Sequence, residues 1–217
     1  MPDAPGAGET HVWVVSTALL APHAAALRSL SGAGVPAREA GRGFLRVLLG
    51  SYLGVRPEDV EIERRCPACG GGHGPPISGD LRISVSYTPG RVVYAFGGSA
   101  VGIDIELIRP TFAWRKLAPL VLAPEELERM HRAPPPDQAV AFLRAWTRRE
   151  AIGKATGAGL LHTPSRQTVG PIRTLALALP EPYVATVALT TPRHVLRRLA
   201  PGRGIHPVIE SLHGTAS

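Results

Sequence analysis

Cysteine is scarce in this chain of 217 residues, which has two, at positions 66 and 69. A secreted disulfide scaffold needs more cysteines than that, so this class of protein is excluded. No apolar run is long enough to cross a bilayer. The first ten residues are polar and rich in glycine and proline, unlike a signal peptide. We therefore expect a soluble, intracellular protein of the cytoplasm with no membrane partner.

Lysine is also nearly missing: of 24 basic residues, only Lys116 and Lys154 are lysines. The formal net charge is nevertheless +7, which indicates a polyanionic partner such as a phosphorylated cofactor, an acidic protein or nucleic acid. The arginines are scattered and no stripe alternates basic with aromatic residues, which argues against nucleic acid. The length allows one large domain or two small lobes, and either can bury a core.

Local patterns predict two α+β lobes, residues 1–109 and 110–217, joined near Pro110. Strands are expected at residues 11–20, 60–64, 81–86, 91–97, 101–107, 172–179 and 184–189. Helices are expected at 36–54, in a short stretch from 123, and from an N-cap at Asp137 to about Gly157. Turn residues separate the three strands between 81 and 107, so we expect them to form an antiparallel meander.

The helix expected at 36–54 carries two stripes. Its apolar residues fall on one face, at 37, 40, 44, 45, 48 and 52. Arg38, Arg42 and Arg46 follow one another every fourth residue beside that face. Such a stripe is either a solvated face or an edge that binds phosphate.

The strand at 101–107 reads Val-Gly-Ile-Asp-Ile-Glu-Leu. Because successive strand side chains point to opposite faces, Asp104 and Glu106 share one face and the isoleucines take the other. Two carboxylates in one pocket repel each other unless a cation lies between them. Oxygen ligands suit Mg²⁺, which binds one or two carboxylates together with phosphates and water. The alternative is a surface strand with two solvated acids.

The long helix places Trp146, Glu150 and Lys154 at every fourth position, on roughly one face. A Glu–Lys pair beside a packed tryptophan is a common helix feature worth tenths of a kcal/mol. The functional interpretation is that Glu150 joins Asp104 and Glu106 at the cation and that Lys154 reaches phosphates.

Cys66 and Cys69 form a Cys-x-x-Cys motif followed by His73. These supply three zinc ligands, one fewer than a closed structural site requires. The alternatives are a zinc site completed from elsewhere, or a tight turn with free thiols.

Taken together, Gly-x-Asp-x-Glu at 102–106 and Trp-x-x-Arg-Glu-x-x-x-Lys at 146–154 resemble the signature of the 4′-phosphopantetheinyl transferase superfamily. The resemblance covers roughly residues 38–160 and is to the larger, surfactin-synthetase-activating type, with the Cys66–Gly74 run of actinobacterial members. It implies a monomer with two pseudo-symmetric lobes, each a small antiparallel sheet packed with helices.

The resemblance also implies a reaction: Mg²⁺- or Mn²⁺-dependent transfer of phosphopantetheine from coenzyme A to a serine of an apo acyl or peptidyl carrier protein, with release of 3′,5′-ADP. Carrier proteins of polyketide and nonribosomal peptide synthesis, in secondary metabolism, are the expected partners. The metal ligands are then Asp104, Glu106 and Glu150, and Lys154 acts on the pyrophosphate. Glu126 matches an acid near the metal or adenylate.

Three positions depart from the family pattern. Pro75 replaces a lysine, Tyr87 replaces the histidine that follows Ser86, and Arg149 replaces a lysine. We expect Ser86 and Tyr87 to contact coenzyme A, with Arg38, Arg42, Arg46 or Arg91 supplying the missing charge. The departures also permit a second hypothesis, a relative that binds coenzyme A or carrier protein without turnover. A third, a zinc-containing nucleic-acid module, rests on the cysteines and the net charge.

Overall fold

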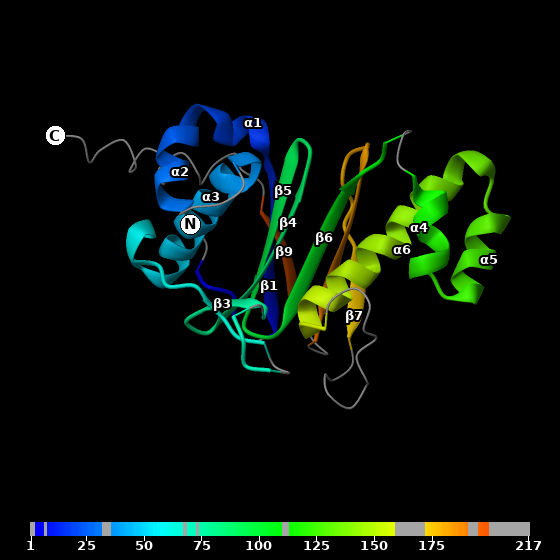
Figure 1. Cartoon of the computed structure of the whole chain (residues 1–217). Helices are drawn as coiled ribbons and strands as arrows, with labels where there is room; N and C mark the ends of the chain where they lie inside the picture. Colours follow the sequence, from blue (N-terminus) through cyan, green and yellow to red (C-terminus); the bar gives the residue numbers. More distant parts are fainter. Residues whose placement is uncertain are drawn as a thin grey trace.

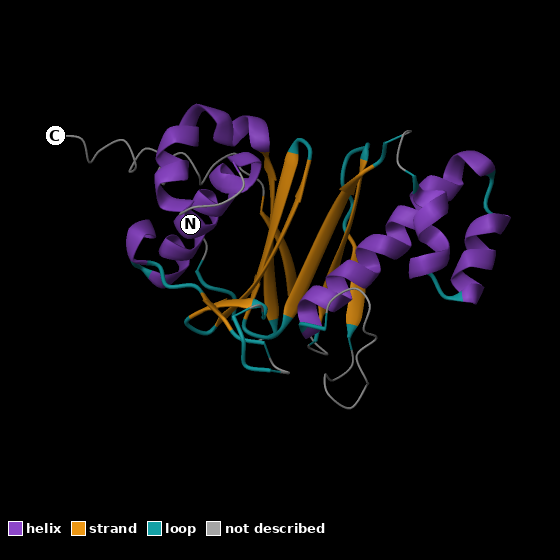
Figure 2. Cartoon of the chain, in the orientation of Figure 1, coloured by secondary structure: helices purple, strands orange, loops and turns teal. Residues whose placement is uncertain are grey.

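Two β-sheets lie face to face in the middle of the molecule, and helices cover their outer faces (Figure 1). The computed structural model describes residues 3–6, 8–31, 36–66, 69–72, 74–109, 113–158, 172–190 and 195–199, with backbone alone at 36–37 and 195–199. Figure 2 shows the strands gathered centrally with helical groups on both sides. The predicted α+β class, with small antiparallel sheets packed with helices, is confirmed.

The first sheet has six strands in the order β2-β3-β4-β5-β1-β9, and the second has three in the order β6-β8-β7. Neighbouring strands are antiparallel, except that β9 runs parallel to β1. The first sheet consists of β1 Glu9–Ser16, β2 Glu63–Arg64, β3 Pro76–Ser78, β4 Leu81–Thr88, β5 Arg91–Gly97 and β9 Val195–Leu199. The second consists of β6 Val101–Leu107, β7 Arg173–Ala176 and β8 Tyr183–Leu189.

The helices fall into two groups. On the outer side of the first sheet are α1 Thr17–Leu20, α2 Ala24–Ser31 and α3 Pro36–Leu53, with the 3₁₀ turns η1 Ala21–His23 and η2 Pro57–Asp59. On the other side are α4 Trp114–Val121, α5 Pro124–Arg132 and α6 Pro135–Thr156. Helix α6 crosses the outer face of the second sheet, while α4 and α5 pack at its far end (Figure 1).

Strand β5 shows how the layers are built from an alternating sequence. Tyr94 and Phe96 point towards α3, where they join Phe44 and other residues of the predicted apolar stripe in one buried cluster. Val93, from the opposite face of β5, is buried in a second cluster between the two sheets. Because β5 is covered on both faces, both sets of side chains are apolar.

Strand β6 does not complete the predicted meander. It pairs with β8 in the second sheet, with Asp104 opposite Thr186, and no ladder joins it to β5. The glycines after β5 do mark a chain reversal, but a turn signal does not specify which strand becomes the partner. The division into lobes 1–109 and 110–217 stays a prediction. Strand β6, from the first of these ranges, joins the sheet of β7 and β8, and β9, from the second range, joins the sheet of β1.

Other element ends differ from the sequence expectations. Helix α6 begins at Pro135 with Pro134 as its N-cap, so Asp137 lies in the first turn instead. Proline fits there because the first helical N–H groups have no partner within the helix. The first strand ends at Ser16 and α1 begins at Thr17, and the strand expected at 60–64 is reduced to β2. Among the helices described, none has the length and hydropathy needed to cross a membrane.

Candidate functional site

A cavity of about 1020 Å³ lies where α3, β4, β6 and α6 come together. Of the residues predicted to contact the cation or coenzyme A, all line it except Glu126 and Arg91: Arg38, Arg42, Arg46, Ser86, Tyr87, Asp104, Glu106, Glu150 and Lys154. The cavity has acidic residues on β6 and α6 and arginines on the α3 side. Residues far apart in the chain therefore meet at one cavity.

The close approach of α6 to β6 creates the acidic part. A Cβ atom at Gly102 would lie 1.8 Å from the main-chain oxygen of Ala151, so only glycine fits here. This contact puts the α6 face that bears Glu150 and Lys154 against β6. Lys154 Nζ consequently donates to Asp104 Oδ1 at 2.6 Å and to the main-chain oxygen of Ile103 at 3.1 Å.

The two oxygens of Asp104 have different surroundings. Oδ1 accepts from Lys154 and also from the hydroxyl of Ser86, at 2.7 Å. Oδ2 is buried and has no hydrogen-bond partner among the described residues. Asp104 itself is 3% exposed. A buried carboxylate oxygen without a partner is costly, so Oδ2 is suited to a cation.

Glu106 and Glu150 are half-buried neighbours of Asp104. Burial raises the pKa of Glu106, the charge of Asp104 raises it further, and Arg109 and Lys154 partly oppose the shift. Burial and the charge of Asp104 likewise raise the pKa of Glu150. The three carboxylates are therefore close enough to repel one another. A divalent cation bound among them would relieve this repulsion.

This donor set fits a hard cation in part. Among the described residues, no three acidic, histidine or cysteine side chains form a complete ligand cluster. Mg²⁺ does not require one, because it commonly takes one or two carboxylates and fills its octahedron with phosphate oxygens and water. The unpartnered Oδ2 of Asp104, with Glu106 or Glu150 from the same cavity, would supply such a set of carboxylates.

The basic part of the cavity centres on Tyr87, which lies against α3. A Cβ atom at Gly41 would be 2.5 Å from the ring, and the guanidinium of Arg38 lies 5.5 Å from the ring centre. Burial raises the pKa of Tyr87, while the charges of Arg42, Arg38 and Arg64 lower it. The tyrosine that replaces a histidine is therefore surrounded by arginines.

Arg42 has two buried nitrogens, Nε and Nη2, without a hydrogen-bond partner among the described residues. Arg46 lines the cavity, but it donates to the main-chain oxygens of Val60, at 2.7 Å, and Pro57, at 3.3 Å. Arg42 is thus available to an anion, whereas Arg46 ties α3 to the turn that follows it.

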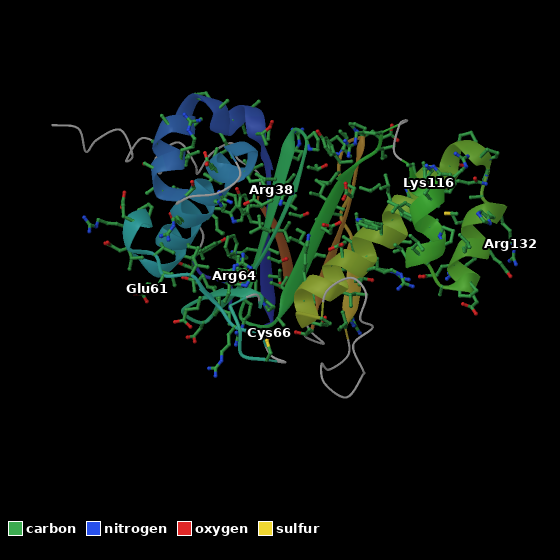
Figure 3. All side chains as sticks on the ribbon, viewed as in Figure 1. Arg38, Glu61, Arg64, Cys66, Lys116 and Arg132 are labelled. Carbon is green, nitrogen blue, oxygen red and sulfur yellow. The ribbon has the colours of Figure 1, made fainter. Side chains whose placement is uncertain are left out.

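Arg64 is a cavity residue that the sequence reasoning missed. It comes from β2, lines the cavity on the same side as Arg38 and donates to the main-chain oxygen of Gly74 at 3.3 Å (Figure 3). Pro75, at the expected lysine position, lines the cavity as well. No local pattern marks Arg64, because its position depends on how the 66–80 segment folds back.

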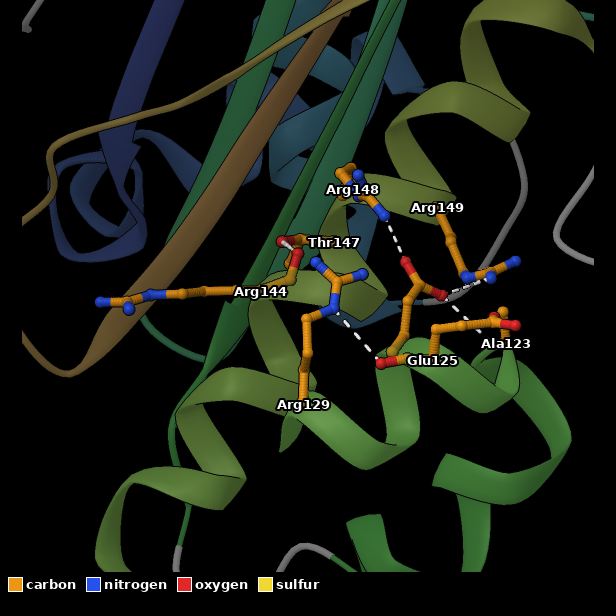
Figure 4. Close-up of polar contacts among 8 residues, drawn as sticks. Ala123, Glu125, Arg129, Arg144, Thr147, Arg148 and Arg149 are labelled. Atoms are coloured by element: carbon orange, nitrogen blue, oxygen red, sulfur yellow. Dashed lines mark hydrogen bonds and ion pairs between the residues drawn. The ribbon is translucent and has the colours of Figure 1, made fainter. Parts of the chain in front are cut away.

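Glu126 is not brought to this cavity. Its carboxylate pairs with Arg148 and with Arg149, at 2.6 Å from the latter, and accepts the N–H of Ala123 at 3.1 Å (Figure 4). Burial acts to raise the pKa of Glu126, but the Arg149 and Ala123 hydrogen bonds and the arginine charges outweigh it and hold the pKa below its usual value. Glu126 lines a separate hollow of about 300 Å³ between α5 and α6.

Main-chain hydrogen bonds join Cys66 to the glycines that follow the cysteine motif. The N–H of Cys66 donates to the oxygen of Gly71 at 2.7 Å, and the N–H of Gly70 donates to the oxygen of Cys66 at 2.8 Å. Cys66 is buried and Cys69 exposed. His73 lies outside the described residues, so zinc binding at Cys66 and Cys69 stays a prediction.

Comparisons with known proteins agree with this geometry. The model of the 4′-phosphopantetheinyl transferase superfamily matches residues 100–201. The 4′-phosphopantetheinyl transferase HetI of Nostoc sp. is 36% identical over 128 residues, 56% of this chain and 52% of the relative. The 4′-phosphopantetheinyl transferase AcpT of Salmonella typhimurium is 33% identical over 153 residues, 65% of this chain and 77% of the relative. AcpT of Escherichia coli is 36% identical over 147 residues, 66% of this chain and 70% of the relative.

Proposed function

The chain belongs to the 4′-phosphopantetheinyl transferase superfamily, and on that premise we propose that it transfers phosphopantetheine from coenzyme A to a carrier-protein serine. The observation that supports this most is a single cavity with carboxylates at one part and unpartnered arginine nitrogens at another. Such a cavity suits a ligand that carries a pyrophosphate and a further phosphate. The chain spans about half of HetI and about three quarters of Salmonella AcpT, so the full activity is a proposal.

In the proposed reaction, the carrier serine oxygen forms a bond to the β-phosphorus of coenzyme A, and the bond from that phosphorus to 3′,5′-ADP breaks. Glu150 accepts the serine proton, directly or through a water. Lys154, anchored beside Asp104, stabilises the leaving phosphate oxygen. Asp104, Glu106 and Glu150 would hold Mg²⁺ or Mn²⁺, which when bound neutralises pyrophosphate charge.

Three arginines would replace the two cationic side chains that the family pattern has at positions 75 and 87. The guanidinium of Arg38 lies 5.5 Å from the ring centre of Tyr87, and the charges of Arg42 and Arg64 act on the same side chain. We propose that Arg42 binds the 3′-phosphate, assisted by the other two. The basic surface would also attract an acidic carrier protein at long range.

A direct assay tests the proposal. The chain is incubated with Mg²⁺, coenzyme A and a panel of apo carriers from fatty-acid, polyketide and peptide synthesis, and intact carrier masses are recorded. We expect holo product with at least one carrier. Glu150→Ala should abolish transfer with an unchanged circular dichroism spectrum, and wild-type turnover by that variant would refute the assignment of Glu150.

The second candidate is a relative that binds coenzyme A or a carrier without turnover. Pro75 and Tyr87, which replace two expected cations along the cavity wall, favour it. Coenzyme A binding measured by calorimetry, with no holo product from any carrier in the panel, would establish this alternative.

A further inference from the structure

Strand β4 meets β6 through side chains, because the two strands belong to different sheets and share no ladder. Two hydroxyls on the same face of β4 act as acceptors for the main chain of β6. Ser84 Oγ accepts the N–H of Ile103 at 3.0 Å, and Thr88 Oγ1 accepts the N–H of Leu107 at 3.1 Å. These two hydrogen bonds fix the position of β6 along the direction of β4.

Ser86 lies between them on the same face, but its hydroxyl contacts a side chain instead. It donates to Asp104 Oδ1 at 2.7 Å, and Lys154 donates to that same oxygen at 2.6 Å. Ser86 is 6% exposed, so water competes poorly for this bond. Two donors on one carboxylate oxygen fix the rotation of the carboxylate and leave Oδ2 as its free oxygen.

We infer that Ser86 is a positioning residue, whose hydroxyl orients Asp104 for the cation and does not bind coenzyme A. The reason is the donor inventory: a serine hydroxyl has one proton, and that of Ser86 is given to Asp104. An ionised phosphate accepts hydrogen bonds and offers none, so Ser86 has nothing left to donate to it. The sequence resemblance assigned this serine to coenzyme A, and the contact indicates a different role.

The inference rests on the proposed cation site, and its consequence is specific. Hydrogen bonds that orient a metal-binding side chain typically account for about 10- to 100-fold in metal affinity. Ser86→Ala should therefore weaken Mn²⁺ binding by about that factor, with the KM for coenzyme A unchanged at saturating metal. Ser86→Thr keeps the hydroxyl and should restore the affinity.

The experiment uses the full chain with coenzyme A present, titrated with Mn²⁺ and followed by electron paramagnetic resonance. Thr88→Val is the matched control, because it removes a neighbouring hydrogen bond between β4 and β6 without touching Asp104. This variant should bind Mn²⁺ as the wild type does. Unchanged Mn²⁺ affinity in Ser86→Ala together with a raised KM for coenzyme A would overturn the inference. Equally weakened Mn²⁺ binding in Thr88→Val would also overturn the inference, since the general packing of β4 against β6 would then be responsible. Failure of the wild type to bind Mn²⁺ would instead refute the proposed cation site itself.

Discussion

Replacing Arg42 by methionine should move stability and ligand binding in opposite directions. Nε and Nη2 of Arg42 are buried and have no hydrogen-bond partner among the described residues, and no salt bridge to Arg42 is found there. A buried donor without a partner costs about 1–3 kcal/mol. Arg42→Met removes these donors and keeps much of the stem, so the ligand-free variant should be at least as stable as the wild type.

The same substitution, Arg42→Met, should weaken coenzyme A binding. A hydrogen bond to a charged group contributes about 1.5–3 kcal/mol, so the loss of one such phosphate contact raises the dissociation constant by about 10- to 160-fold. Arg38→Met is the control, because Arg38 is exposed and stacks on Tyr87. We expect it to weaken binding less than Arg42→Met does.

Calorimetry with coenzyme A and thermal denaturation without ligand measure the two effects on the same samples. A lower unfolding midpoint for Arg42→Met with an unchanged dissociation constant would show that Arg42 is a structural residue. The unpartnered nitrogens of Arg42 would then not be a phosphate site.

Three further predictions concern packing and charge. Glu126→Ala should lower the free energy of unfolding by about 1–3 kcal/mol, because it removes a carboxylate that accepts several charged or main-chain donors. Since the pKa of Glu126 is lowered, this stabilisation is present above its ordinary pKa of 4.5 and lost as pH falls through the folded value, which urea melts at two pH values will detect. Gly102→Ala should destabilise the fold by at least about 1–3 kcal/mol, whereas Gly98→Ala, with its nearest atom 4.0 Å away, should not; thermal melts compare them. Glu150→Gln should raise the thermal midpoint at neutral pH in the presence of a chelator, because a carboxyl whose pKa is raised above 4.5 loses stability as pH rises through the folded pKa. The same variant should match the wild type at a pH below about 4, where both side chains are neutral.

Elements with strong local patterns were predictable from the sequence. Helix α3 and strands β5 and β6 have the expected bounds to within a residue, because apolar periodicity and glycine turns encode them directly. The alternation in β6 also predicted that Asp104 and Glu106 share a face. Their meeting with Glu150 and Lys154 was one of two interpretations of the α6 pattern, and the family resemblance favoured it.

Partner choice was not predictable in this way. Strand β6 leaves the meander for β8, and β9 adds in parallel beside β1, and no local pattern marks either partner. Glu126 was expected near the metal or adenylate but instead pairs with arginines of α6. Such contacts depend on how helices cross, which a motif spacing does not specify.

The most direct test of the proposed reaction measures both products together. Apo carrier, coenzyme A and Mg²⁺ are incubated with the chain, and holo carrier and 3′,5′-ADP are quantified from the same sample. We expect equal molar amounts of the two products, and none of either when a chelator replaces Mg²⁺. An unchanged carrier mass in the presence of bound coenzyme A would contradict this expectation and leave a protein that binds the cofactor without transferring its phosphopantetheine.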